Sequence, residues 1–132
     1  ALGIARAAID DAWQYSQERI QFGKPICHNQ SIRHMLSDSK TKLEACRLMT
    51  YQGAWLASQN IESSIEMSMA KLFVTETARD IVLTCQEVLG AYGYVKDLDM
   101  ERYVRDILVM PIIGGSSAMQ KNNIANRLNL PK

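Results

Sequence analysis

The sequence predicts an all-α fold, an up-down-up-down four-helix bundle with a short extra C-terminal helix. Apolar residues recur at steps of three and four along three long segments, and short stretches rich in glycine, proline or polar residues separate these segments. No convincing strand pattern occurs. The chain has 132 residues, of which 47% are apolar and 22% charged, so we expect one domain with a sizeable core.

The first predicted helix runs from Ala1 to Ile20 and ends near Phe22 and Gly23, because Gly23 can cap it and Pro25 cannot continue it. Its mostly apolar face has helical spacing and consists of Leu2, Ala5, Ile9, Ala12, Trp13 and Ser16. The chain begins abruptly inside this helix. We therefore expect residues 1–132 to be a single domain of a longer protein.

The second predicted helix covers residues 30–60, roughly 45 Å at about 1.5 Å per residue. The positions that repeat along it are Ile32, Leu36, Ser39, Leu43, Cys46, Thr50, Gly53 and Ala57. This row is less apolar than a pure core stripe. Either a neighbouring helix comes close at Gly53 or the packing there is weak, and the sequence leaves both explanations open.

The third predicted helix begins at Ser63 or Ser64, whose hydroxyl can accept from first-turn amides, and continues to Gly90. Its apolar face, with one threonine in the row, is Ile65, Met69, Leu72, Phe73, Thr77, Ile81, Cys85 and Val88. Three long helices joined by short loops pack most simply as antiparallel neighbours.

Two shorter helices complete the prediction. Asp99 can cap the first of them, which Pro111 ends, and Ser116 or Ser117 can cap the second, which continues through Leu128. Four of the seven glycines lie in the same part of the chain and indicate special turns, namely Gly90, Gly93, Gly114 and Gly115. We expect any ligand to bind near these turns.

Composition excludes several functions. The net charge is +1 and no long basic run occurs, so nothing favours nucleic acid or an anionic membrane surface, and no apolar run is long enough to span a membrane. His28 and His34 have no third partner at ligand spacing, so we expect no metal site. The odd, widely spaced cysteines indicate small buried residues in a reducing compartment: Cys27, Cys46 and Cys85.

Taken alone, the polar residues near the glycine turns leave two interpretations each. Arg19 could bind a phosphate or could offset the negative end of the first helix. Ser116 and Ser117 could present helix amides to an anion or could form a plain N-cap. Surface ion pairs are the expected role of the closely spaced charges Glu101, Arg102, Arg105 and Asp106.

Three segments carry a resemblance to a known family. The segments ERIQFGKPI (residues 18–26), LGAYGYVKDLDMERYVRD (89–106) and PIIGGSSAMQ (111–120) resemble, in order and spacing, three signatures of the C-terminal domain of acyl-CoA dehydrogenases. The similarity covers essentially the whole chain. It implies a third domain that follows a helical and a β-domain, with FAD between the β-domain and the bundle.

The same resemblance implies an activity. In the family, a carboxylate removes the α-proton of an acyl-CoA thioester, a β-hydride goes to the flavin, and electrons pass to an electron-transferring flavoprotein. It also implies cofactor contacts, several of them with the FAD of a neighbouring subunit, at Arg19, Gln21, Phe22, Asn29, Gln30, Glu87, Gly90, Ala91, Ser116 and Ser117. Glu87 and Ala91 stand where the family usually has glutamine and glycine.

The acyl pocket implied by the resemblance includes Ile113, Gly114 and Gly115. Many members have the catalytic glutamate at the position of Gly114, and glycine cannot take a proton, so we expect no catalytic residue on this chain. Either the glutamate lies upstream, about ten residues before Gly3 by the resemblance, as in isovaleryl- and long-chain-type branches, or the base is missing. We favour the displaced base.

The sequence therefore predicts the FAD-binding and oligomerisation domain of a homodimeric or homotetrameric acyl-CoA dehydrogenase, inactive when isolated. The expected location is the cytoplasm of a bacterium or the mitochondrial matrix of a eukaryote. One alternative is a helical assembly domain with a degraded flavin site. The other is a flavin-dependent oxygenase or reductase on the same scaffold.

Overall fold

Five α-helices account for most of the computed structural model, which describes residues 1–131. The helices are α1 (Leu2–Glu18), α2 (Gln30–Ser58), α3 (Ser64–Leu89), α4 (Met100–Val109) and α5 (Ser117–Arg127). The short elements are strands β1 (Ile20–Gln21) and β2 (Lys24–Pro25) and the 3₁₀ turns η1 (Ile26–His28) and η2 (Gly90–Gly93). The predicted all-α bundle with an additional C-terminal helix is confirmed.

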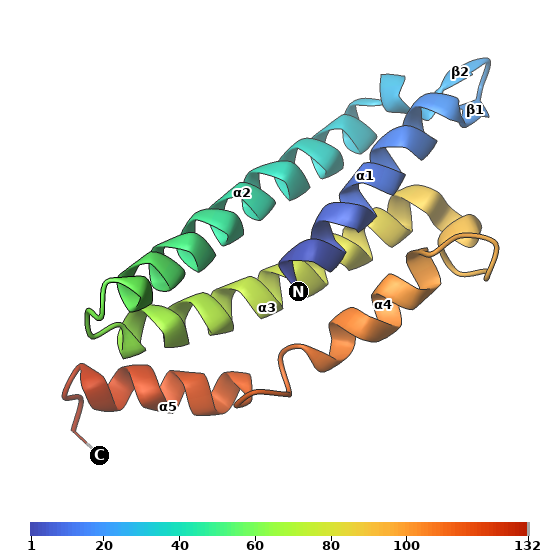
Figure 1. Ribbon diagram of the computed structural model, residues 1–132. Helices are drawn as coiled ribbons and strands as arrows, with labels where there is room; N and C mark the ends of the chain where they lie inside the picture. The colour runs from blue at the N-terminus through green and yellow to red at the C-terminus, as the bar shows by residue number, and fades with distance from the viewer. Residues whose placement is uncertain (132) are drawn as a thin grey trace.

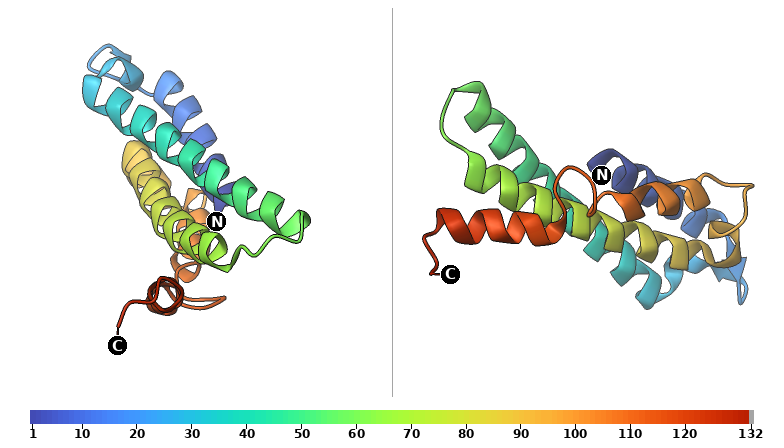
Figure 2. Two further views of the ribbon diagram at one scale, coloured as in Figure 1. Left: turned by 90° about the vertical axis from the view of Figure 1, so that its left-hand side faces the viewer. Right: turned by 90° about the horizontal axis from the view of Figure 1, so that it is seen from below.

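The helices α1, α2 and α3 run up, down and up, and α4 and α5 together occupy the fourth position of the bundle (Figure 1). Helix α4 lies along the C-terminal half of α3, and α5 continues along its N-terminal half, as the views of Figure 2 also show. Helix α3 packs against all four other helices. The linker between α4 and α5 therefore crosses the middle of α3.

The core lies where α1, α3 and α4 meet. Three alanines on α1 are fully buried, which allows α1 to pack closely against α3. The largest fully buried side chains of this region are Ile9, Ile81, Met100 and Ile107. Ser16 is buried too, and its hydroxyl donates to the Trp13 carbonyl at 2.8 Å, so its polar group is satisfied within its own helix.

The end of α1 differs from the prediction. The helix stops at Glu18, and a two-stranded antiparallel ribbon follows, in which Ile20 pairs with Pro25. Phe22 and Gly23 both have positive φ, 52° and 79°, the combination of a type I′ hairpin turn. The expectations of no strand and of a helix cap at Gly23 were therefore wrong, because two consecutive left-handed residues favour a hairpin.

Helix caps follow the prediction only in part. The Ser116 hydroxyl accepts from the Met119 amide at 3.4 Å and caps α5 as expected. Ser63 and Asp99 occupy the N-cap positions of α3 and α4, but neither side chain makes a capping hydrogen bond. The Asp99 carboxylate instead pairs with the Arg102 guanidinium at 3.2 Å.

Close packing explains the glycine on α2. Gly53 is buried, and a Cβ atom there would lie 2.7 Å from the Met67 sulfur of α3, so the helices approach closely at this point. Cys46 and Cys85 are buried as expected, whereas Cys27 is only half-buried. Five residues expected to face the core are exposed instead, because no element covers them: Trp13, Thr50, Ala57, Met69 and Phe73.

Candidate functional site

The hairpin end of the bundle contains a cleft of about 300 Å³ that unites four of the predicted site residues. Arg19 reaches it from the end of α1, Gln21 from the hairpin, and Gly90 and Ala91 from the end of α3. The remaining walls are Tyr15, Ile26, Val88, Leu89 and Tyr92. Segments about 70 residues apart in the sequence therefore form one surface, with polar side chains from Arg19 and Gln21 beside apolar ones such as Ile26 and Val88.

One tyrosine contacts the arginine of this cleft, and a second tyrosine packs against the first. The Arg19 guanidinium carbon lies 5.7 Å from the centre of the Tyr92 ring, and the Tyr92 and Tyr15 rings are 6.0 Å apart. A cation over an aromatic face is attracted by the ring quadrupole, and the contact restricts the long side chain. Arg19 can thus offer a partly ordered guanidinium to an anionic group in the cleft.

The two glycines at the ends of the η2 turn are required for different structural reasons. Gly90 ends α3 with φ 59° and ψ −133°, and a Cβ atom there would meet nothing within 4 Å, so its backbone faces open space. Gly93 is buried, and its Cβ atom would lie 2.9 Å from the Gln86 carbonyl oxygen. The turn is therefore open at the cleft and closed against the helix.

Four other predicted residues lie outside this cleft. Phe22 is at the hairpin tip with 95% of its surface exposed, and Glu87 is exposed on the last turn of α3. Asn29 is the residue before α2, and Gln30 borders a separate depression of about 480 Å³. The other residues of that depression are His28, Arg33, His34 and Ser37.

The second group of predicted residues forms the α4–α5 turn. Gly114 and Gly115 have φ values of 62° and 85°, which glycine adopts without strain. Ile113 beside them is half-exposed, and Ser116 and Ser117 begin α5. The turn is exposed on one side and lies against α3 and α5 on the other, so it presents backbone and small side chains to the surroundings.

One polar atom of this turn lacks a partner. The Ser117 hydroxyl oxygen is buried, yet within residues 1–131 it makes no hydrogen bond. Such groups are rare because a buried hydroxyl without a partner costs about 1 to 3 kcal/mol. An orphaned hydroxyl at a helix start is therefore a candidate ligand contact.

The two groups lie apart in this chain. The β1–β2 hairpin is at one end of the bundle and the linker between α4 and α5 is near the middle of α3, as Figures 1 and 2 show from three directions. The residues that line the hairpin cleft include none from the turn. A single chain thus presents two separate surfaces rather than one enclosed site.

Acidic residues concentrate elsewhere, between α1 and α4. A cleft of about 440 Å³ there includes Asp11, whose carboxyl pKa is raised by partial burial, and Tyr103, whose pKa is raised for the same reason. None of the predicted site residues lines this cleft. No acidic residue follows Asp106 in the sequence, so the α4–α5 turn contains no carboxylate of its own.

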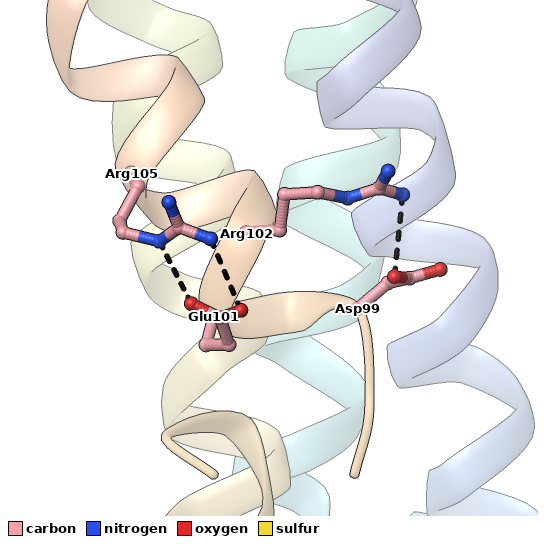
Figure 3. A network of polar contacts seen from close by, with 4 residues as sticks. All are labelled: Asp99, Glu101, Arg102 and Arg105. Carbon is pink, nitrogen blue, oxygen red and sulfur yellow. Dashed lines mark hydrogen bonds and ion pairs between the residues drawn. The ribbon is translucent and has the colours of Figure 1, made fainter. Parts of the chain in front are cut away.

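The charges at the start of α4 form surface ion pairs, as predicted (Figure 3). The Arg105 guanidinium donates two hydrogen bonds to Glu101, at 2.8 and 3.1 Å, and Arg102 pairs with Asp99 rather than with Asp106. The pairing with Arg105 lowers the pKa of the Glu101 carboxyl. These exposed pairs contribute little to stability.

The described residues include neither a metal-binding cluster nor a membrane-spanning helix. Within residues 1–131, no group of three or more histidine, cysteine, aspartate or glutamate side chains is arranged to hold a metal ion. None of the helices described is both long and apolar enough to cross a membrane.

Comparison with known proteins identifies the family. A family profile described as "Acyl-CoA dehydrogenase, C-terminal domain" matches residues 1–129. The chain belongs to this family. It is 41% identical over 128 residues to the 3-(aryl)acrylate reductase of Clostridium sporogenes, a match that covers 97% of this chain and 34% of that protein.

Solved structures agree. Butyryl-CoA dehydrogenase from Megasphaera elsdenii superposes with a TM-score of 0.94 at 33% identity, over 96% of this chain and 33% of that one. A structure described as the FAD complex of PigA gives 0.93 at 29% identity, over 98% and 34%. The chain spans about a third of the length of the relatives it matches.

The sequence did not indicate three residues that shape these acyl-CoA dehydrogenase surfaces. Tyr92 lies under the Arg19 guanidinium, Tyr15 packs against Tyr92, and Gln120 donates from α5 to the carbonyl oxygens of the glycine turn. The tyrosines carried a weak signal, since Tyr92 lies within the second motif and Tyr15 lies just before the first. Gln120 ends the third motif, but its partners could not be expected from the sequence because they depend on how the turn folds back.

Proposed function

We propose that this chain is the third domain of a flavoenzyme that oxidises an acyl-CoA thioester at the α,β-carbons, and that it binds FAD and joins subunits. The observation that carries the proposal is the orphaned Ser117 hydroxyl at the start of α5. The resemblance assigns Ser116 and Ser117 to the cofactor. A flavin acceptor or donor at this position would supply the missing hydrogen bond.

The hairpin cleft fits a second part of the same cofactor. Its guanidinium at Arg19 suits a pyrophosphate, and the open backbone at Gly90 allows a close approach. FAD, when bound, supplies the acceptor for the hydride. Because the cleft and the Ser117 turn are separate in one chain, we propose that each FAD touches the turn of one subunit and the cleft of another.

Glu87 and Ala91 are compatible with this arrangement. Glu87 is exposed and does not line the hairpin cleft, so its charge need not oppose a phosphate there. Ala91 lines the cleft, but it follows the residue whose backbone is open. The residues present therefore fit an FAD that approaches through Arg19 and Gly90.

The base would come from outside this chain. Gly114 has no side chain, and a Cβ atom there would meet nothing within 4 Å, so the turn leaves room for an incoming carboxylate or a branched acyl group. We propose a glutamate upstream of Ala1, held within reach of the α-proton. The isolated chain is then inactive, because it has no base at the site.

Association with further copies is part of the proposal. Large apolar side chains are exposed on α2 and α3, and a stable homodimer or homotetramer would cover them. They are Leu48, Tyr51, Trp55, Met67, Met69 and Phe73. We further propose that the enzyme transfers electrons to an electron-transferring flavoprotein, in a bacterial cytoplasm or a mitochondrial matrix.

A second candidate function is the reverse direction, reduction of an activated double bond. The similarity to the Clostridium sporogenes reductase favours it. The two directions involve the same atoms. Dehydrogenation begins with oxidised flavin and a saturated thioester, and reduction begins with reduced flavin and an unsaturated one. A bundle with a degraded flavin site, whose role is assembly alone, would bind no FAD.

The first experiment is FAD titration of the whole protein. We expect a yellow, saturable complex whose dissociation constant rises about tenfold in Ser117→Ala, since a lost hydrogen bond to a ligand is worth about 1.4 kcal/mol. Ser64→Ala is the matched control, because Ser64 also begins a helix and is also half-buried. Absence of any complex in the unmodified protein would leave only the assembly role.

The second experiment separates the two directions. Saturated acyl-CoA thioesters are added to the oxidised complex without oxygen, and unsaturated ones to the dithionite-reduced complex. Bleaching in the first case supports dehydrogenation, and reoxidation by unsaturated thioesters alone supports the reductase. Light scattering of the same protein tests assembly, and a monomeric mass would refute it.

A further inference from the structure

The linker between α4 and α5 has its carbonyl groups turned inward. The Pro111 carbonyl oxygen accepts from the Ser117 amide at 3.0 Å and from the Lys71 ammonium of α3 at 3.3 Å. The Gly114 and Gly115 carbonyl oxygens accept from the Gln120 side-chain amide at 3.3 and 3.1 Å. Donors on α3 and α5 therefore hold three carbonyls of one short loop.

Gln120 is suited to this task. It is on the first turns of α5 and only 7% exposed, so its side chain is fixed by its surroundings. A side-chain amide nitrogen carries two hydrogens and can serve both carbonyls at once. The two acceptors belong to neighbouring peptide groups, so a single side chain orients two consecutive peptide planes.

This orientation determines where the amide hydrogens point. The chain has no cis peptide bond among its described residues, and in a trans peptide the N–H points opposite to the C=O. The N–H groups of Gly115 and Ser116 therefore face away from Gln120, towards the exposed side of the turn. Within residues 1–131 neither of them donates a hydrogen bond.

Gln120 also dictates the choice of glycine. A Cβ atom on Gly115 would lie 2.6 Å from the Gln120 amide nitrogen, whereas one on Gly114 would meet nothing within 4 Å. Both residues have positive φ, so a side chain at either position would strain the backbone. Only at Gly115 would the side chain also collide with Gln120, which is a second reason for glycine there.

We infer that Gln120 is a positioning residue of the active site: its amide orients the Gly114–Gly115 turn so that two free backbone donors face the bound acyl-CoA or flavin. The inference rests on the proposed function, which makes this turn a wall of the acyl pocket. Gln120 touches neither ligand. Its effect is to hold the turn before binding, so that ligand contacts form without reorganisation of the loop.

The test uses the whole flavin-loaded protein and two variants, Gln120→Glu and Gln120→Met. The first keeps the shape but puts a carboxylate against two carbonyl oxygens, and the second is similar in size without a donor. Gln17→Glu is the control, since Gln17 is an exposed glutamine on α1. Amide hydrogen exchange of residues 111–120, the acyl-CoA KM, the FAD dissociation constant and kcat are measured together.

We expect both variants to exchange faster at residues 111–120 and to lose at least about tenfold in kcat/KM. A raised acyl-CoA KM alone would mean that the donors serve the thioester, and a raised FAD dissociation constant would mean that they serve the flavin. Unchanged exchange, or faster exchange with unchanged kinetics and FAD affinity, overturns the inference.

A double-mutant cycle covers the case in which these variants do not fold. Gly115→Ala should cost more activity than Gly114→Ala, and in a Gln120→Ala background the two should cost the same, because the close contact is gone. Strictly additive effects overturn the inference. If no thioester reduces the flavin of the unmodified protein, the proposed function fails. If the unmodified protein is active and the Gln120 variants match it, only the positioning role fails.

Discussion

The two halves of α3 are packed in different ways. In the C-terminal half, medium-sized and large apolar residues are almost fully enclosed, as at Ile81, Val82 and Leu89. In the N-terminal half the buried apolar residues are smaller, with Ala70 and Val74 among them, and larger ones are exposed. One helix thus has a finished core at one end and an open surface at the other.

The length of α1 accounts for the difference. Its 17 residues reach roughly 26 Å, whereas the 29 residues of α2 reach roughly 44 Å, so α1 covers only part of the α2–α3 pair (Figure 1). On the C-terminal half of α3, α1 and α4 complete the core. On the N-terminal half, α2 and α5 pack, and α1 is absent.

The difference teaches that helical periodicity identifies which apolar residues share one face of a helix, but not which neighbouring elements cover that face. Met69 and Phe73 satisfy the same pattern as Ile81 and Val88, yet 36% of Met69 and 41% of Phe73 is exposed. A large apolar side chain left exposed on a long helix points to a missing neighbour. This is the surface that the proposed assembly would cover.

The largest expected effect comes from truncating one residue in each half. Ile81→Ala should lower the free energy of unfolding of this chain by about 2 to 5 kcal/mol, since Ile81 is 1% exposed and its loss leaves a cavity. Phe73→Ala should cost less than about 1 kcal/mol in the monomer. Urea denaturation monitored by circular dichroism measures both, and equal losses would contradict the contrast.

A buried thiol in the enclosed half of α3 should also make the free energy of unfolding depend on pH. Burial, with a smaller effect of Asp11, raises the pKa of the Cys85 thiol from 9.0 to about 12. Between these values the folded state keeps a proton that the unfolded state has lost. The free energy of unfolding should therefore fall as pH rises from 9 towards 12, by about 1.4 kcal/mol per pH unit.

Replacement of the thiol separates this effect from other titrations at high pH. Cys85→Ala should have a shallower slope of stability against pH than the unmodified chain. Val82→Ala is the control, since Val82 is equally buried and has no titrating group, so its stability should fall without a change of slope. Identical slopes for all three would mean that the thiol is not protected from water.

A smaller effect is expected where α2 meets the open half of α3. Gly53→Ala gains helix propensity worth up to about 1 kcal/mol but places a methyl group against the Met67 sulfur. Met67 is flexible and 48% exposed, so it can move aside, and the net change should stay below about 1 kcal/mol. In a Met67→Ala background the same change should stabilise the chain. Thermal unfolding of the four proteins measures the coupling.

The smallest effect on stability should accompany a large effect on assembly. Trp55→Gln and Tyr51→Gln should change the free energy of unfolding by less than about 0.5 kcal/mol, because 59% of each side chain is exposed. We expect both to weaken self-association in sedimentation velocity. Gln52→Ala removes no apolar side chain from this surface and should weaken the association less than either aromatic variant. Unaltered association of the two aromatic variants would mean that another surface joins the subunits.

Much of the fold could be predicted from the sequence. Spacing identified the three long helices, capping residues and Pro111 identified the two short ones, and one of the two serines expected to cap α5, Ser116, does so. The hairpin after Glu18 was missed because the signal was two residues long and the second of them, Gly23, equally suits a helix cap. Local patterns decide extended periodic elements better than tight turns, whose alternatives differ by one or two dihedral angles.

The candidate site divides in the same way. The motifs indicated Arg19, Gly90 and Ala91, and the structure brings them to one cleft, although the sequence could not show which of the other motif residues would stay outside it. The structure alone revealed that Gln120 holds the glycine turn, since this depends on how α5 folds back on its own linker.

The sequence by itself determined the helices and the glycine turns that follow α3 and α4, because these follow from residue type and short-range spacing, and its resemblance to the family implied that Gly114 stands where a base is usual. The tertiary structure decided which apolar residues of α3 are enclosed, which polar hydroxyl is left without a partner, and which way the α4–α5 turn presents its amides. Each of these depends on the relative position of elements distant in the chain, and only packing in three dimensions sets that position.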